Sequence, residues 1–422
     1  MAGTARLPDA RRTARSAYDS RMDYRSTQPA HGLPRIVAAA ISASTVGALP
    51  ALLVGGLAVL VRAELGFDEV RLGAAISAFF AASIVLSVPA GMVSERFGPQ
   101  RSLLFGLSIT VTALLGAAGT AHTWLELVMW LFLAGAGNTI GQVATNHMLA
   151  TAVRPERQGL SYGVKQSSIP LAGMLAGLAL PTIGLTVGWR WAFVLAAVIS
   201  IVVVVLMGRP RPFTRPSGRA FREGDAPIPA LLVVSVAAAL GAAAGNALAS
   251  FTVESAVARG FDASAAGLLL TVGSLCGVSM RVLSGWIGDR LGRGSLLVAI
   301  LLQLVGVVGY LVLALAGGSA AITVLATVLA FGGGWGYQGL VLLAISRSNP
   351  TSPATAMAIV RLGPSTGAMI GPLLIGALVS VGGYDLAWLM TAVSAALAAV
   401  LMFTGRVMLL RHRRAATIVA PG

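Results

Sequence analysis

Apolar segments of about 20 residues, long enough to cross a lipid bilayer as helices, recur along nearly the whole chain. Hydrophobic residues make up 56% of the sequence and charged residues only 11%, a composition too apolar for a soluble protein. Backbone groups inside a bilayer must be hydrogen-bonded within their own segment, so such segments fold as helices. We therefore expect an all-α membrane protein with twelve transmembrane helices between about residues 34 and 405.

The basic residues are distributed unevenly between the two predicted sides of the membrane. If the N-terminus is cytoplasmic, 23 of the 30 lysines and arginines fall on the cytoplasmic side and four on the other. Cytoplasmic loops accumulate positive charge, so we expect a multi-pass protein of the cytoplasmic (inner) membrane with both termini cytoplasmic. The formal charge of +15 then reflects topology, and no nucleic-acid partner is expected. The excess of arginine over lysine is typical of a GC-rich bacterial genome.

The polar stretches divide the chain into two halves joined by a basic linker. The N-terminal tail has no apolar run, and the stretch from Gly208 is rich in Pro and Arg, as in an extended linker. The predicted parts are a cytoplasmic tail without fixed structure (1–33), a six-helix bundle (34–207), a cytoplasmic linker (208–228), a second six-helix bundle (229–410) and a cytoplasmic C-terminal tail (411–422).

The two halves repeat each other at a constant offset of 194 residues. The shared positions are Phe67, Asp68, Gly73, Gly91, Glu95, Arg96 and Gly98, which recur as Phe261, Asp262, Gly267, Gly285, Asp289, Arg290 and Gly292. A six-helix unit duplicated in parallel is typical of one large class of secondary transporters, which hold substrate near the membrane midplane between the halves.

The second copy of this repeat, GWIGDRLGR from Gly285 to Arg293, resembles the signature loop G-x-x-x-D-R-x-G-R of the major facilitator superfamily. The first copy, from Gly91 to Arg101, matches with Glu95 in place of the aspartate. The resemblance covers about residues 34–410 and implies two pseudo-symmetric bundles that rock around a central site. The acids and arginines of the loops can pair across helix ends and hold one conformation closed, or they only anchor the helices at the interface. The candidate gating residues are Gly91, Glu95, Arg96, Gly98, Arg101, Gly285, Asp289, Arg290, Gly292 and Arg293.

Three cations, Lys165, Arg281 and Arg361, lie inside apolar spans, about 12 Å from the predicted cytoplasmic edge. No acidic residue lies at comparable depth, so the three predict a binding site for an anion. Lys165 and Arg361 occupy related positions in the two halves. Arginine can clamp a carboxylate with two parallel hydrogen bonds, and lysine supplies a point charge. Arg281 also resembles the anion-binding arginine of monocarboxylate, oxalate and nitrate carriers in the family. The alternative is that all three snorkel to the interface.

Amide side chains follow one face of the predicted fourth span. Asn138, Gln142 and Asn146 are spaced four residues apart, and amides turned toward lipid would lack partners, so this face should line the substrate site. Gln338 in the tenth span and Asn246 in the seventh are further candidates. The alternative role is hydrogen bonding between helices, worth under about 2 kcal/mol per bond.

Two side chains are candidates for carrying a coupling proton. His147, next to the amide face, titrates near neutral pH when unperturbed, although a lone membrane histidine is as often structural. Glu254, near the outer end of the seventh span, is the acidic alternative.

The sequence predicts a gradient-driven transporter of a small organic anion, most simply a carboxylate. It has no phosphate-binding glycine loop, metal-ligand cluster or nucleophile–base arrangement, so neither an enzyme nor a cofactor or metal is expected. A monomer is expected, because one chain holds both halves of the site. The main alternative is a proton-coupled exporter of drugs or hydrophobic metabolites. Such family members usually carry an arginine where this chain has Leu131, and a G-x-x-x-G-P-x-x-G-G motif that this chain lacks. A membrane sensor that kept the transporter fold is a further alternative.

Overall fold

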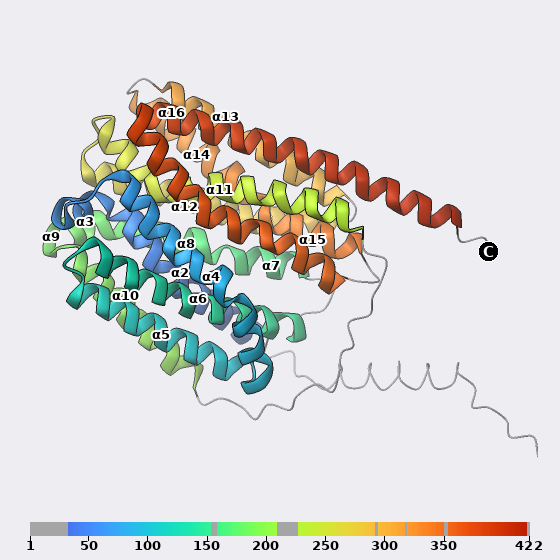
Figure 1. Cartoon of the computed structure of the whole chain (residues 1–422), viewed down its shortest axis with the longest axis horizontal. Helices are drawn as coiled ribbons and strands as arrows, with labels where there is room; N and C mark the ends of the chain where they lie inside the picture. The colour runs from blue at the N-terminus through green and yellow to red at the C-terminus, as the bar shows by residue number, and fades with distance from the viewer. Residues whose placement is uncertain are drawn as a thin grey trace, which may run out of the picture.

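The computed structural model describes residues 33–152, 158–208, 227–291, 294–316, 319–349 and 353–419, and every regular element within these ranges is a helix. The helices run side by side along the long axis of the molecule (Figure 1). The predicted all-α fold class is therefore confirmed. Eleven of the described segments are long and apolar enough to cross a membrane.

The first part of the chain forms six crossings, and two of them are built from more than one helix. The elements are α2 (Leu33–Gly56), α3 (Ala58–Leu65), α4 (Glu69–Phe97), α5 (Pro99–Thr120), α6 (Trp124–Ala152), α7 (Gln158–Gln166), α8 (Ser168–Ala179), the π-helix η3 (Leu180–Gly184), α9 (Leu185–Val187) and α10 (Trp189–Met207). The elements from α7 to α9 follow one another as a single apolar crossing, Gly163–Val187.

The second part repeats this pattern. The elements are α11 (Ile228–Ala258), α12 (Ala263–Leu291), α13 (Ser295–Leu315), α14 (Ala320–Gly336), α15 (Gln338–Ser348) and α16 (Pro353–Val419). The chain folds back within α16 at Gly382 and Gly383, where Gly383 has a φ of 69°. This fold-back, visible in red in Figure 1, divides α16 into a first arm and a second arm, which correspond to the last two predicted spans.

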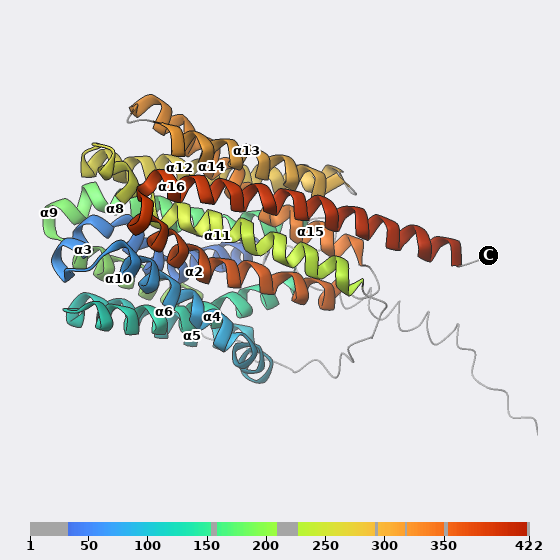
Figure 2. The ribbon, with the colours of Figure 1, turned by 45° about the horizontal axis from the view of Figure 1, so that its top comes forward.

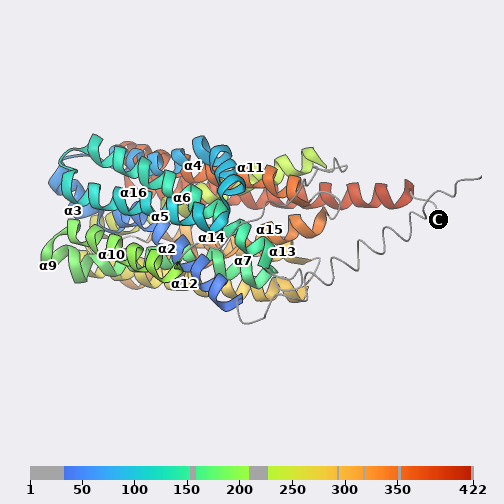
Figure 3. The same cartoon turned by 90° about the horizontal axis from the view of Figure 1, so that it is seen from below.

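The bundle has two ends, which we call the termini side and the opposite side. The termini side holds the start of α2 and the ends of α4, α10 and α16; the opposite side holds the turns at Gly66, Gly188, Gly260 and Gly383. All four of these glycines have positive φ, which residues with a Cβ rarely adopt. Figure 1, Figure 2 and Figure 3 all place α3 and α9 on the opposite side and the end of α16 on the termini side.

Helices from the two parts of the chain approach closely through glycine. A Cβ on Gly73 of α4 would lie 2.2 Å from the Pro372 carbonyl oxygen of α16, and one on Gly177 of α8 would lie 2.6 Å from the Gly267 oxygen of α12. Small residues at such crossings let helix backbones meet in a membrane. The predicted tail 1–33 and linker 208–228 fall almost wholly outside the described residues. The second arm of α16 continues as helix to Val419, into the predicted C-terminal tail.

Candidate functional site

The three cations singled out in the sequence lie on three elements: Lys165 on α7, Arg281 on α12 and Arg361 on the first arm of α16. Lys165 is 1% exposed and Arg281 is 2% exposed, while Arg361 is half-buried. The charges of both arginines act on Lys165, and we call these three residues, which come from both parts of the chain, the cationic cluster.

Arg281 makes three hydrogen bonds, all to neutral oxygen atoms. Its Nε donates to the Trp335 carbonyl and its Nη2 to Gln338 Oε1, each at 2.8 Å, and its Nη1 donates to the Gln166 carbonyl. The guanidinium also stands 5.5 Å from the centre of the Trp335 ring. These contacts join α12 to α14 and α15 and, through Gln166, to α7.

The Gln166 carbonyl is available to Arg281 because the helix is broken there. Four residues later stands Pro170, which has no backbone N–H to donate, and α7 ends at Gln166. A carbonyl left without a donor in the membrane is costly, and a helix C-terminus attracts positive charge. Arg281 supplies both the donor and the charge.

A second helix break meets Arg281 from the other side. α14 ends at Gly336 and α15 begins at Gln338, so the carbonyls of the last turn of α14 lack some of their helical donors. Arg281 donates a hydrogen bond to the Trp335 carbonyl, and the Ser284 hydroxyl donates one to the Gly336 carbonyl at 2.8 Å. Arg281 therefore caps two interrupted helices, a role that its position in the sequence did not reveal.

Lys165 has different partners from Arg281. Its ammonium donates to Gln142 Oε1, and Gln142 Nε2 lies 3.4 Å from Asn138 Oδ1 on the preceding turn of α6. The predicted amide face thus meets the cationic cluster through Gln142. On the same face the buried Asn146 Oδ1 has no hydrogen-bond partner within the described residues.

The other predicted polar residues fall into different settings. Gln338 joins the cluster by accepting from Arg281. Asn246 hydrogen-bonds within its own helix, with Nδ2 2.8 Å from the Ala242 carbonyl. His147 Nδ1 lies 3.3 Å from Ser94 Oγ near the termini side. Glu254 lies on the opposite side, where it belongs to a separate group of charges.

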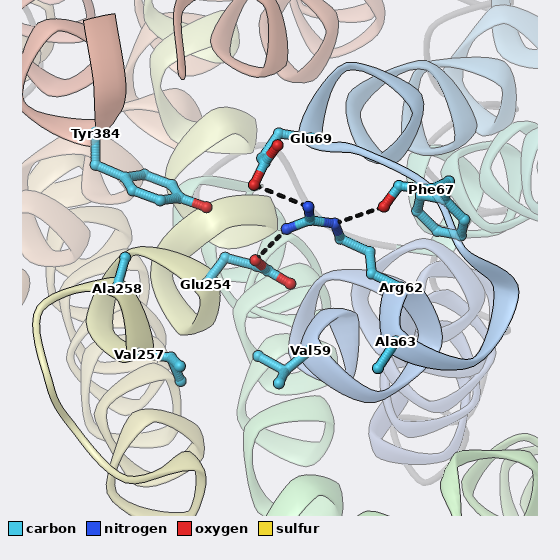
Figure 4. Close-up of a pocket in the computed structure, with 9 residues that line it drawn as sticks. All are labelled: Val59, Arg62, Ala63, Phe67, Glu69, Glu254, Val257, Ala258 and Tyr384. Carbon is cyan, nitrogen blue, oxygen red and sulfur yellow. Dashed lines mark hydrogen bonds and ion pairs between the residues drawn. The ribbon is translucent and has the colours of Figure 1, made fainter. Parts of the chain in front are cut away.

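That second group lies on the opposite side and is centred on Arg62 of α3 (Figure 4). Arg62 pairs with Glu69 of α4 at 2.8 Å and with Glu254 of α11 at 2.5 Å, and its Nε donates to the Phe67 carbonyl at 3.1 Å. Burial lowers the pKa of Arg62, but the two carboxylates outweigh this and leave the pKa above its ordinary value. The pair with Glu254 joins the two parts of the chain.

A pocket of about 350 Å³ adjoins these charges, and Tyr384 of α16 points its hydroxyl into it (Figure 4). The Tyr384 hydroxyl and the Glu254 carboxylate lie close enough across this pocket for the two groups to interact. Glu254 was among the residues predicted from the sequence, whereas Arg62 and Glu69 were not. Their signal was faint, because an outer arginine and an acid at a helix start are common in membrane proteins.

The two predicted gating loops differ from each other in this structure. Asp289 lies 3.3 Å from Arg347, whose Nη1 donates to the Gly288 carbonyl at 2.7 Å, so this pair holds α12 to α15 within the second part of the chain. Arg290 stacks 3.8 Å above the Trp286 ring. Gly292 and Arg293 lie outside the described residues.

In the first loop, Gly98 ends α4 with a φ of 87°. Arg96 lies 5.5 Å from the centre of the Phe97 ring, and Glu95 and Arg101 are exposed. The residues that the repeat relates to the Arg347 region fall in 153–157, outside the described residues.

The helical bundle, its apolar spans and its buried polar cluster define a multi-pass membrane protein of the transporter class. The chain matches the Major Facilitator Superfamily in two overlapping regions, residues 36–354 and 236–417, and it belongs to this family. The resemblance seen in the two charged loops is thereby confirmed.

Individual relatives match the chain over shorter stretches. The class G tetracycline resistance protein of Vibrio anguillarum is 29% identical over 150 residues, which cover 34% of this chain and 37% of that protein. The hexuronate transporter of Bacillus subtilis is 23% identical over 146 residues, 35% of this chain and 34% of the transporter. The chain thus spans about a third of the length of these curated relatives.

Among solved structures, a bacterial homologue of the human lysosomal transporter Spinster, in an inward-facing and unoccupied conformation, superposes with a TM-score of 0.69. The match covers 91% of this chain and 99% of that protein at 17% sequence identity. At this identity the likeness concerns the fold.

Proposed function

We propose that this transporter moves a small organic anion, with a carboxylate as the simplest candidate, by gradient-driven alternating access. The observation that carries the proposal is the cluster of Lys165, Arg281 and Arg361, in which both charges acting on Lys165 are themselves positive. The described acidic residues lie near helix ends, away from this depth. A cluster of buried like charges is costly, and an anionic substrate would relieve that cost.

The three cations have different roles in this proposal. The donors of Arg281 already hydrogen-bond to Trp335, Gln338 and Gln166. Arg281 therefore holds the broken helices together and attracts the anion through its positive charge, without touching it. Lys165 and Arg361 are the groups that touch the anion. The amides of Asn138, Gln142 and Asn146 supply hydrogen bonds and shape, Gln338 fixes Arg281, and Asn246 stays on the wall of the site. This division differs from the sequence-based expectation, in which arginine at 281 clamps the carboxylate.

The two relatives point to different substrate classes. The hexuronate transporter takes its name from a sugar acid with a carboxylate, which agrees with the cationic cluster. The tetracycline resistance protein represents the rival function, proton-coupled export of a drug. That rival calls for a deeply placed carboxylate to bind a cationic group, and the cluster offers positive charges instead. In either case His147 and Glu254 are the candidates for a coupling proton.

We further propose that the termini side faces the cytoplasm across the inner membrane and that a monomer is sufficient for transport. The Arg62–Glu254 pair would hold the opposite side closed in the conformation described here, and the two charged loops would close the termini side in the alternate one. The excess of arginine on the loops of the termini side supports this orientation.

Thermal unfolding of the purified protein against carboxylates, inorganic anions and cationic drugs tests the proposal, because a ligand that binds only the native state raises its midpoint. We expect one anion class to stabilise the parent protein but not Lys165→Met or Arg361→Met. Arg411→Met, which removes an exposed charge at the end of α16, is the matched control and should respond like the parent. Stabilisation by cationic drugs that persists in both cluster variants would contradict the proposal.

A further inference from the structure

The contact between α4 and the first arm of α16 is closed on the opposite side. These antiparallel helices meet where a Cβ on Gly73 would lie 2.2 Å from the Pro372 oxygen. Nearer the end, a Cβ on Gly376 would lie 2.4 Å from the Glu69 oxygen. We call this contact the α4–α16 seam.

The same seam is open on the termini side. Gly91 follows Gly73 by 18 residues, about five turns of an ideal helix, so both face the same way. A Cβ on Gly91, however, would meet no described atom within 4 Å. Ile84 is 39% exposed and Val88 is 71% exposed along the same stretch. Pro89, which cannot make the normal helical hydrogen bond, lies in this part of α4 and favours a bend.

The seam related to it by the repeat, between α7–α8 and α12, is closed on both sides. A Cβ on Gly177 would lie 2.6 Å from the Gly267 oxygen toward the opposite side. Toward the termini side, a Cβ on Gly163 would lie 2.8 Å from the Arg281 oxygen, and Arg281 bonds the Gln166 carbonyl across this seam. Of these two seams between the parts of the chain, only the α4–α16 seam is therefore open on the termini side.

Arg361 connects this opening to the cationic cluster. It precedes Pro372 by 11 residues, about three turns, so it lies on the face of α16 that meets α4. Because the helices are antiparallel, Arg361 comes level with the part of α4 near Ile84, where the seam is open. Arg361 is half-buried, and its charge acts on Lys165 inside the cluster. By this register, Arg361 is the member of the cationic cluster that comes level with the exposed apolar residues of α4.

We propose that the substrate is an amphipathic anion that enters the site sideways from the lipid through the α4–α16 seam. Its acidic head binds Lys165 and Arg361, while its apolar chain lies along Ile84 and Val88 of α4. A compact hydrophilic anion would gain nothing from an apolar entrance, whereas a chain-bearing anion stays in an apolar environment as its head reaches the cations. This inference rests on the proposed anion site and adds the chemistry of the chain.

The test uses the full protein in nanodiscs of phosphatidylcholine, with thermal unfolding as the readout. Acetate, hexanoate and dodecanoate have the same head and increasing chains. We expect apparent affinity to rise with chain length, by up to about fourfold for each methylene buried, and to be lost in Lys165→Met. The lost response in that variant controls for partitioning into the lipid. The same unfolding measurement in nanodiscs that contain phosphatidic acid, without added carboxylate, distinguishes two ligands. A raised midpoint there indicates a lipid, and an unchanged midpoint indicates a single-chain acid.

A bulky side chain in the seam provides a second experiment. Gly91→Trp should weaken stabilisation by dodecanoate several-fold while leaving that by acetate unchanged. Gly119→Trp is the matched control, because a Cβ there also meets no described atom within 4 Å, but the residue lies on α5 near the opposite side. If Gly91→Trp does not fold, Val88→Glu places a repelling charge at the same opening.

The outcomes separate this inference from the proposed function. Equal stabilisation by acetate and dodecanoate, lost in Lys165→Met, would overturn the lateral entrance but keep the anion site. Stabilisation by dodecanoate that survives in Lys165→Met and Arg361→Met would overturn both. Equal effects of Gly91→Trp and Gly119→Trp would also overturn the entrance.

Discussion

Arg281 and Lys165 are both almost fully buried cations, yet their surroundings give them different energetic roles. Arg281 satisfies carbonyls at two helix ends and therefore holds structure together. Lys165 has one amide partner among the described residues and is repelled by two neighbouring charges. The contacts of Arg281 stabilise the fold. The positive charges around Lys165 are not balanced by an acidic partner among the described residues, so they favour the binding of an anion.

Replacing these two cations by methionine should therefore have opposite consequences for stability. Arg281→Met leaves the Trp335 and Gln166 carbonyls unpaired, and we expect a loss of about 2–5 kcal/mol. Lys165→Met removes a buried charge and should leave the melting temperature unchanged or raised. Thermal unfolding in detergent without ligand measures both. A larger loss in Lys165→Met than in Arg281→Met would contradict these roles.

A proline substitution tests why the Gln166 carbonyl needs Arg281. Pro170→Ala restores an N–H four residues after Gln166, so the carbonyl gains a helical donor. In a double-mutant cycle, Pro170→Ala should reduce the cost of Arg281→Met, with a coupling energy of about 0.5–3 kcal/mol. Additive effects of the two substitutions would show that the missing donor is not what binds Arg281 to α7.

At the scale of elements, the sequence predicted the spans well but not their interruptions. Apolar runs locate a crossing because lipid imposes length and composition together. The breaks at Gln166 and Tyr337 depend on donors brought from α12, and this pairing is visible only once the helices are packed. The depth of the three cations was predicted in the same way and stays a prediction. Their distinct partners were not, because a count of residues from a loop gives depth and no orientation.

The α4–α16 seam leads to a prediction about two glycines of one helix. Gly73→Ala should destabilise this conformation, because the Pro372 oxygen would lie 2.2 Å from the new Cβ. Gly91→Ala has open space and should leave the melting temperature unchanged. It should nevertheless slow transport, since the alternate conformation must close the seam at Gly91. Unfolding and proteoliposome uptake separate the two effects. Unchanged uptake in a folded Gly91→Ala protein would indicate that the seam does not close there.

At the scale of the whole molecule, Arg62 has one carboxylate partner in its own part of the chain and one in the other. If the two parts separate on the opposite side, Arg62 can keep Glu69 but must release Glu254. The pair with Glu254 therefore opposes opening, whereas the pair with Glu69 does not. This difference gives two carboxylates of similar geometry distinct effects on the conformational equilibrium.

Glu254→Gln should shift the equilibrium toward opening on the opposite side by about fivefold, corresponding to about 1 kcal/mol for a partly exposed pair. Glu69→Gln is the matched control and should have a smaller effect. A cysteine at Val257, which lines the pocket, can report opening by its labelling rate with an impermeant maleimide once Cys276 is replaced by alanine. Equal labelling in both variants would remove Glu254 from the proposed closure.

The central claim, that the cluster at Lys165 and Arg361 binds and moves an anion, is tested most directly by charge movement in proteoliposomes. The measurement is the transient current on a supported membrane after a jump in anion concentration. We predict a saturable current for chain-bearing carboxylates that disappears in Lys165→Met and Arg361→Met and persists in Arg411→Met. A current that is unchanged in both cluster variants, or one evoked only by cationic drugs, would contradict the account.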